Sequence, residues 1–245
     1  MRYRKAKGLL RSKSGWLLCV FSAGVWAVLA LLFWLADFRA PADLAVWAFH
    51  PFGGVAPTGQ PDPISLLCWY AWLFPGFLAA LSVSQREMGS RRFLVLPRLG
   101  SAGRWLRRLY GRLLWQSVGY TLFGAALYLL WGIAAGCTPA KEASVPALLL
   151  TCLCAALHLA VIALWAATAG LLWGHRAALG LFLLADASTA VLGGLLRTHS
   201  PFLLGSIGMG RQGTPTAADL AVLAVLLLLP FVFSRVSARR ALQNG

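Results

Sequence analysis

Apolar residues in this chain are gathered into long runs that charged residues rarely interrupt. Six runs stand out, at residues 16–36, 64–84, 113–135, 145–173, 177–196 and 217–234. A helix of about 20 apolar residues is long enough to cross the hydrocarbon core of a bilayer. Hydrocarbon offers no partner to exposed backbone groups, and the alternating pattern of a membrane barrel is missing, so the spans are expected to be helices. The pattern predicts an all-α polytopic membrane protein with six transmembrane helices in one domain, residues 1–245.

The stretches between the runs differ in what they predict. Residues 37–63 are rich in proline and glycine, which excludes one continuous helix, and within them residues 43–49 are expected to form a short helix on the outer leaflet. Residues 197–215 carry four glycines beside an apolar triplet, so they are expected to form a re-entrant or broken segment between the fifth and sixth spans.

The distribution of charge predicts how the spans are oriented. The chain has 22 Lys and Arg against seven Asp and Glu. With six spans, 18 of the 22 cations fall on the side that holds both termini, and only Arg39, Lys141, Arg197 and Arg211 fall on the other. Cytoplasmic loops of membrane proteins are enriched in Lys and Arg, so both termini are expected in the cytoplasm. Orientation alone explains these cations, and nucleic-acid binding is not expected.

Tryptophans follow the same boundaries. An indole ring is favoured at the membrane–water interface, where one end of the ring is apolar and the other is wet. Six of them fall near predicted span ends: Trp16, Trp34, Trp72, Trp115, Trp131 and Trp173.

One long charged segment, residues 85–112, separates the second span from the third and holds eight of the Lys and Arg. In its second half, the helical spacing of four arginines puts them on one face: Arg104, Arg107, Arg108 and Arg112. This predicts an amphipathic interfacial helix on the inner leaflet, with guanidinium groups among lipid phosphates. Two interpretations stay open for these arginines, namely orientation and lipid anchoring alone, or contact with a cytoplasmic partner.

The first half of this segment carries a more specific pattern. Glu87-x-Gly89-Ser90, followed by Leu94 and Pro97, resembles the Glu-x-Gly-Thr…Leu…Pro motif after the second span of type-2 ABC exporter permeases. Ser90 replaces the usual Thr, the proline comes one residue early, and the arginines at 91 and 92 stand where relatives are often acidic or neutral. The resemblance extends at pattern level to the number of spans, the cytoplasmic termini and the broken segment before the last span.

This resemblance implies a short coupling helix that docks into a cytoplasmic ATPase. The residues implied to couple to the ATPase are Glu87, Gly89, Ser90, Arg91, Arg92, Leu94 and Pro97. A carboxylate near the start of such a helix is favourable to its dipole, Gly89 permits close backbone approach, and Pro97 ends the helix.

The implied complex pairs this chain with a second permease chain, as a homodimer or heterodimer, and with ATPase subunits that bind ATP and Mg. It would lie in the plasma membrane of a bacterium and export an amphipathic peptide, such as an antimicrobial peptide, a lipid or another hydrophobic cargo by alternating access. The chain has no Gly-x4-Gly-Lys-Ser/Thr phosphate loop, so it is expected not to hydrolyse ATP itself and to be a transport subunit, not an enzyme. It also has no zinc-type His/Cys cluster and no pair of histidines inside the spans, so no metal or cofactor is expected on this chain. The alternatives are an ATPase-independent accessory or immunity protein and, less favoured, an intramembrane hydrolase.

Two ionisable residues lie deep inside predicted spans, His158 in the fourth and Asp186 in the fifth. An ionised aspartate at the centre of the bilayer costs about 2.5–3.5 kcal/mol on insertion scales. One hypothesis places both residues on a substrate path at the permease dimer interface. The alternatives are a neutral core imidazole for His158 and, for Asp186, an internal partner at Ser188 or Thr189 or a shallower fifth span.

Overall fold

A computed structural model describes residues 17, 20–35, 44, 47, 50–52, 63–88, 101–138, 145–174, 176, 178–180, 184 and 217–243. Nearly all of these residues are helical, and no β-strand occurs among them. Three helices are long and apolar enough to cross a membrane, and two shorter apolar helices accompany them, Val20–Leu35 and Leu220–Phe233. The prediction of an all-α membrane protein is confirmed at this level, while the number of spans and the location of the termini stay predictions.

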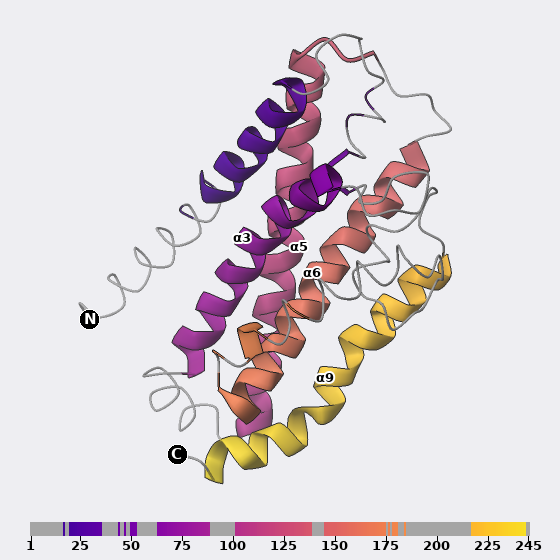
Figure 1. The fold of residues 1–245 in the computed structure, drawn as a ribbon. Coiled ribbons are helices and arrows are strands. Elements are labelled where there is room, and N and C mark those ends of the chain that lie inside the picture. The colour runs from indigo at the N-terminus through magenta and orange to yellow at the C-terminus, as the bar shows by residue number, and fades with distance from the viewer. Residues whose placement is uncertain are drawn as a thin grey trace, which may run out of the picture.

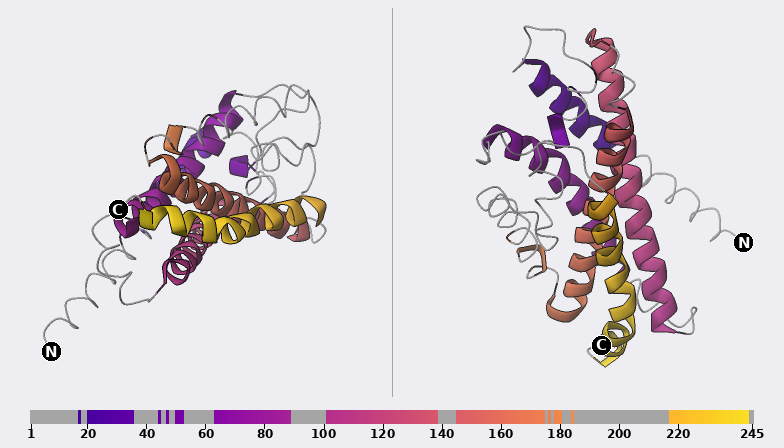
Figure 2. Two further views of the ribbon diagram at one scale, coloured as in Figure 1. Left: turned by 90° about the horizontal axis from the view of Figure 1, so that it is seen from below. Right: turned by 90° about the vertical axis from the view of Figure 1, so that its right-hand side faces the viewer.

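The long helices form an elongated bundle around one central helix (Figure 1). The central helix is α6 (Val145–Trp173), which packs against α3 (Pro63–Met88), α5 (Ala102–Ala134) and α9 (Ala217–Gln243). It is apolar on all sides, and most of its membrane-spanning length is buried inside the bundle. Figure 2 shows the same bundle from below and from the side, with helix Val20–Leu35 beside the later half of α5.

The ends of α5 and α6 follow local chemistry. Ser101 lies just before α5 in an extended conformation, and its hydroxyl accepts a hydrogen bond from the Arg104 backbone N–H, as an N-cap residue does. Pro146 falls in the first turn of α6, where its missing N–H costs nothing. Beyond the helix ends, Gly136 and Gly174 have φ of 86° and 90°, which a residue without Cβ adopts without strain. Helix α6 therefore begins and ends where the sequence placed the fourth apolar run, 145–173, while its role as a membrane span stays a prediction.

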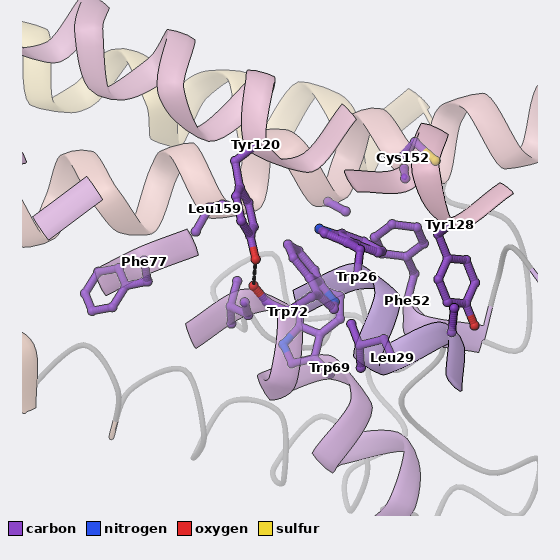
Figure 3. Packing of buried hydrophobic residues seen from close by; sticks show 14 of the residues in the cluster. Trp26, Leu29, Phe52, Trp69, Trp72, Phe77, Tyr120, Tyr128, Cys152 and Leu159 are labelled. Atoms are coloured by element: carbon purple, nitrogen blue, oxygen red, sulfur yellow. Dashed lines mark hydrogen bonds between the residues drawn. The ribbon is translucent and has the colours of Figure 1, made fainter. Parts of the chain in front are cut away.

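An aromatic core fills one half of the bundle, between helix Val20–Leu35, the short helix η1 (His50–Phe52), α3, α5 and α6 (Figure 3). Trp26 is its centre, with ring centroids 5.7 Å from Phe52, 5.9 Å from Trp72 and 5.9 Å from Tyr128. The Tyr120 hydroxyl donates to the Trp72 carbonyl oxygen at 2.9 Å and so connects α5 to α3. This core contains three of the four fully buried tryptophans, Trp26, Trp69 and Trp72, so we expect much of the stability to come from it.

Two tryptophans in this half of the bundle are covered by protein, although the sequence predicted them at the membrane surface. Trp72, expected near the membrane–water interface, is fully buried, and its indole Nε1 donates to the carbonyl oxygen of Pro51 in η1 at 3.0 Å. Trp47, from the segment expected on the outer leaflet, is buried against the bundle and donates to the Tyr128 carbonyl oxygen at 2.8 Å. In both cases a buried carbonyl oxygen satisfies the indole N–H, so the ring does not need water.

The charged segment before the third span also differs from expectation. The four arginines were expected on a helix that lies on the inner leaflet and leads into the third span, but they belong to α5, which is one helix of 33 residues, about 50 Å long. Its first turns continue the axis of the span instead of lying along the membrane surface (Figure 1). Arginine and leucine are both good helix formers, so a change from polar to apolar residues does not by itself end a helix. Similarly, α3 continues past residue 84 to Met88, and α9 past residue 234 to Gln243.

Candidate functional site

The candidate site is the end of the bundle where α3 stops, α5 starts, and α6 and α9 stop (Figure 1). We call it the arginine end. Its exposed cations are Arg86, Arg104, Arg107, Arg108, Arg112 and Arg176. Among the side chains that the structure describes, no Lys or Arg lies at the opposite end of the bundle. The asymmetry that the sequence places in loops is therefore also present along the folded bundle.

Glu87, the first residue of the motif, does not lie where the sequence predicted. It was expected near the start of a short coupling helix, but it lies in the last turn of α3. A carboxylate at the C-terminal end of a helix faces the negative pole of the helix dipole, which is unfavourable. The compensation is an ion pair in which Arg112 Nη1 donates to Glu87 Oε1 at 2.6 Å.

This ion pair joins α3 to α5, and its two residues are 25 positions apart in the sequence. The Glu87 side chain is 15% exposed and that of Arg112 is 47% exposed, so water partly screens the pair. Pairs at such sites contribute about 1 kcal/mol or less to stability. Its main consequence is geometric, because it ties the end of α3, where the motif begins, to α5.

The face of α5 opposite its arginines is packed into the bundle. Buried residues at helical spacing contact α3, α6 and α9: Ala102, Trp105, Leu106, Leu109, Tyr110 and Leu113. Tyr110 forms a hydrogen bond with Thr168 Oγ1 of α6 at 2.8 Å, and its ring centroid lies 5.2 Å from that of Phe231 of α9. The Thr168 hydroxyl itself donates to the Leu164 carbonyl oxygen at 2.8 Å, so Tyr110 is the donor in the first bond. The arginine turns are therefore held by three helices.

The remaining motif residues lie outside the described part of the chain: Gly89, Ser90, Arg91, Arg92, Leu94 and Pro97. The coupling helix itself stays a prediction. The structure describes only the residues that come directly before this segment, Arg86 to Met88 in the last turn of α3.

Of the two ionisable residues inside predicted spans, the structure describes only His158. His158 is 1% exposed on α6, with its ring centroid 5.4 Å from that of Trp69 on α3. It therefore lies inside the chain's own core. Asp186 falls outside the described residues, as do most of the predicted fifth span and the broken segment at 197–215. The substrate-path hypothesis for the two residues stays a prediction.

Sequence reasoning missed the residues that hold the arginine end in place. Tyr110 and Trp105 lie within a charged segment, and nothing in their spacing identifies Thr168 or Phe231 as neighbours. A signal for the buried face was present, because the apolar residues between the arginines recur at three and four positions. No family model, curated protein or solved structure matches the chain. Function is therefore inferred from this geometry and from the resemblance of the motif.

Proposed function

We propose that this chain is the membrane-spanning subunit of an ATP-driven exporter of the type-2 ABC kind. The observation that carries the proposal is the Glu87–Arg112 ion pair. It connects the first residue of the motif to α5, a helix that packs against α3, α6 and α9 at the arginine end. A partner that binds the motif would thus act on α3 and α5 together.

The mechanism follows from how these helices are packed. A push on the segment after Met88 is applied directly to the end of α3 and, through Arg112, to α5. Both helices pack against α6, whose side chains fill the space between them. Because a close-packed interior transmits displacement instead of absorbing it, motion at the arginine end reorients the spans as a unit. ATP and Mg would be bound by the partner ATPase, which supplies the energy.

The direction of the helices supports the topology that this role requires. In Figure 1, both α6 and α9 run toward the arginine end, so the chain must return between them. A fifth span at 177–196 would make that return and would leave both chain ends on the arginine side. By the positive-inside rule, the arginine end then faces the cytoplasm of a bacterium, where an ATPase is available. The cargo proposed is an amphipathic peptide, a lipid or another hydrophobic molecule, taken up within the spans by a pair of permease chains.

The test is co-purification of a nucleotide-binding subunit with matched variants. Glu87→Gln changes the motif itself, whereas Arg112→Gln breaks the same ion pair and leaves the motif intact. We expect Glu87→Gln to lose the ATPase subunit, and Arg112→Gln to retain it but to stimulate its ATP hydrolysis less on addition of cargo. ATP turnover by the purified chain alone, or labelling of a cysteine at position 108 from outside the cell, would contradict the proposal.

A second candidate is an ATPase-independent accessory or immunity protein. It is favoured by one observation, that Glu87 is only 15% exposed and already engaged by Arg112, which leaves less of its carboxylate for a partner. This candidate predicts that Glu87→Gln and Arg112→Gln behave alike and that neither changes the set of co-purified proteins. An intramembrane hydrolase would instead show activity as an isolated chain.

A further inference from the structure

The exposed face of α5 changes character abruptly along its length. Residues three, four or seven apart share a helix face, and most of the exposed residues of α5 form one stripe. The stripe starts with arginines, passes Trp115, and continues with apolar residues. In order it contains Arg104, Arg107, Arg108, Gly111, Arg112, Trp115, Gly119, Leu122, Phe123, Leu130 and Ile133.

Because the predicted third span begins at residue 113, Trp115 is expected where this stripe enters the hydrocarbon. Its side chain is 80% exposed, the most exposed of the large apolar residues described. Exposed tryptophans are favoured at the level of the headgroups. From Trp115, the rise of 1.5 Å per residue places Gly111 about 6 Å and Arg108 about 10 Å further out along the helix axis. Each headgroup layer is about 5–8 Å thick, so Gly111 lies at the level of the lipid phosphates.

Gly111 makes a gap in the stripe at that level. It is exposed, and a Cβ built on it would meet nothing within 4 Å. Its neighbours on the helix surface are Arg107, Arg108 and Trp115, and Arg112 follows it directly. The gap therefore has backbone as its floor, guanidinium groups beside it on the water side and an indole on the membrane side.

We propose that this gap, the Gly111 seat, binds the headgroup phosphate of an anionic phospholipid. Guanidinium groups match the oxygens of a phosphate with paired N–H donors, and the amphipathic indole suits the boundary with the acyl chains. Arg112 donates one N–H to Glu87 and retains other donors for the lipid. The apolar stripe beyond Trp115 is where the acyl chains of the same lipid would lie.

An anionic lipid fits better than a zwitterionic lipid or a free anion. The exposed arginines at this end include Arg86, Arg104, Arg107 and Arg108, and Glu87 is the one acidic side chain described there. A zwitterionic headgroup carries a positively charged group of its own, which these arginines would repel. Free phosphate would use the arginines but would gain nothing from Trp115 or the apolar stripe. The lipid site does not depend on an ATPase partner, so its test is independent of the test of the proposed function.

The test measures lipid binding to the purified full-length chain in detergent by native mass spectrometry. The chain is titrated with phosphatidylglycerol, with phosphatidylcholine as the zwitterionic arm and inorganic phosphate as the free-anion competitor. Gly111→Leu fills the seat, and leucine is the better helix former, so the variant is expected to fold. Gly119→Leu is the matched control, because Gly119 lies on the same stripe with equally open space but beyond Trp115.

We expect phosphatidylglycerol to bind at least fivefold tighter than phosphatidylcholine, roughly the effect of one arginine near an anionic surface. Arg108→Gln and Gly111→Leu should each lower the affinity for phosphatidylglycerol by about fivefold or more, and Gly119→Leu should leave it unchanged. If Gly111→Leu bound phosphatidylglycerol as tightly as the wild type, or if Gly119→Leu lost as much affinity as Gly111→Leu, the proposal of a binding site at Gly111 would be overturned. Equal binding of phosphatidylcholine, or displacement of the lipid by millimolar phosphate, would overturn the assignment to an anionic lipid.

Discussion

The contact between Trp26 and Gly124 gives the sharpest test of the packing. The indole of Trp26 lies directly on α5, and a Cβ added at Gly124 would be 1.8 Å from its Nε1 and 2.2 Å from its Cδ1. Carbon atoms in contact are about 3.5–4 Å apart, so the ring would have to move by roughly 1.5–2 Å. Trp26 is fully buried between Phe52, Trp72 and Tyr128, whose ring centroids all lie within 6 Å of its own. These rings leave no space into which the indole could shift.

Gly124→Ala should therefore destabilise the fold even though alanine is the better helix former. Overpacking of a core costs about 1–3 kcal/mol, and occasionally more. Replacing glycine by alanine in a helix returns about 1 kcal/mol. With a rigid, enclosed ring as the obstacle, the upper end of the first range applies, and the net loss is about 2 kcal/mol. For a chain of this size, that lowers Tm by about 4–8 °C.

The matched control is Gly119→Ala on the same helix, where an added Cβ would meet nothing within 4 Å. This variant should gain helix propensity without a clash and raise Tm by about 2–4 °C. Both variants are compared with the wild type by thermal unfolding in one detergent at one scan rate, because unfolding of such proteins is often irreversible. Equal Tm values for Gly124→Ala and Gly119→Ala would refute the packing of Trp26 against α5. A Trp26→Leu background should abolish most of the difference between the two variants.

Three further predictions concern the arginine end. Tyr110→Phe removes the hydrogen bond to Thr168 and should cost about 0.5–1.5 kcal/mol, seen as a lower Tm; an unchanged Tm would mean that the bond contributes nothing. Glu87→Gln breaks the pair with Arg112, which is partly exposed, so stability should fall by about 1 kcal/mol or less. A larger loss would place the pair in a drier environment than its exposure indicates. Trp115→Leu should change stability by less than about 0.5 kcal/mol because the side chain is 80% exposed, and a large fall in Tm would show that a neighbour covers it.

The features that the sequence predicted well are those with a local cause. The fourth span was placed at residues 145–173, and α6 is Val145–Trp173. Its apolar run lies between Pro146 in the first turn and Gly174, whose positive φ ends the helix. These two residues determine where the helix begins and ends. The arginine face of α5 was also predictable, because helical spacing depends only on position along the chain.

The candidate site was predictable only in part. The sequence identified Glu87 as part of the motif and Arg112, separately, as one of the arginines that share a helix face. Their ion pair depends on α3 continuing to Met88 and on the angle at which α3 meets α5, and neither follows from local sequence. The helix boundary at residue 113 was wrong for a related reason: polarity marks where a helix leaves the membrane, while backbone hydrogen bonding decides where the helix ends.

By itself, then, the sequence determined that the chain is helical, that it contains membrane-spanning segments, and which end of the bundle carries its arginines. The tertiary structure decided which side chains are covered. Trp72 and Trp115 are the same residue type and were both expected near the membrane–water interface, yet the first is fully buried and the second is 80% exposed. The difference comes from η1, whose Pro51 carbonyl oxygen accepts the hydrogen bond of the Trp72 indole. In a bundle whose central helix is apolar all round, no periodicity indicates which neighbour covers which face, because every face is equally able to be buried.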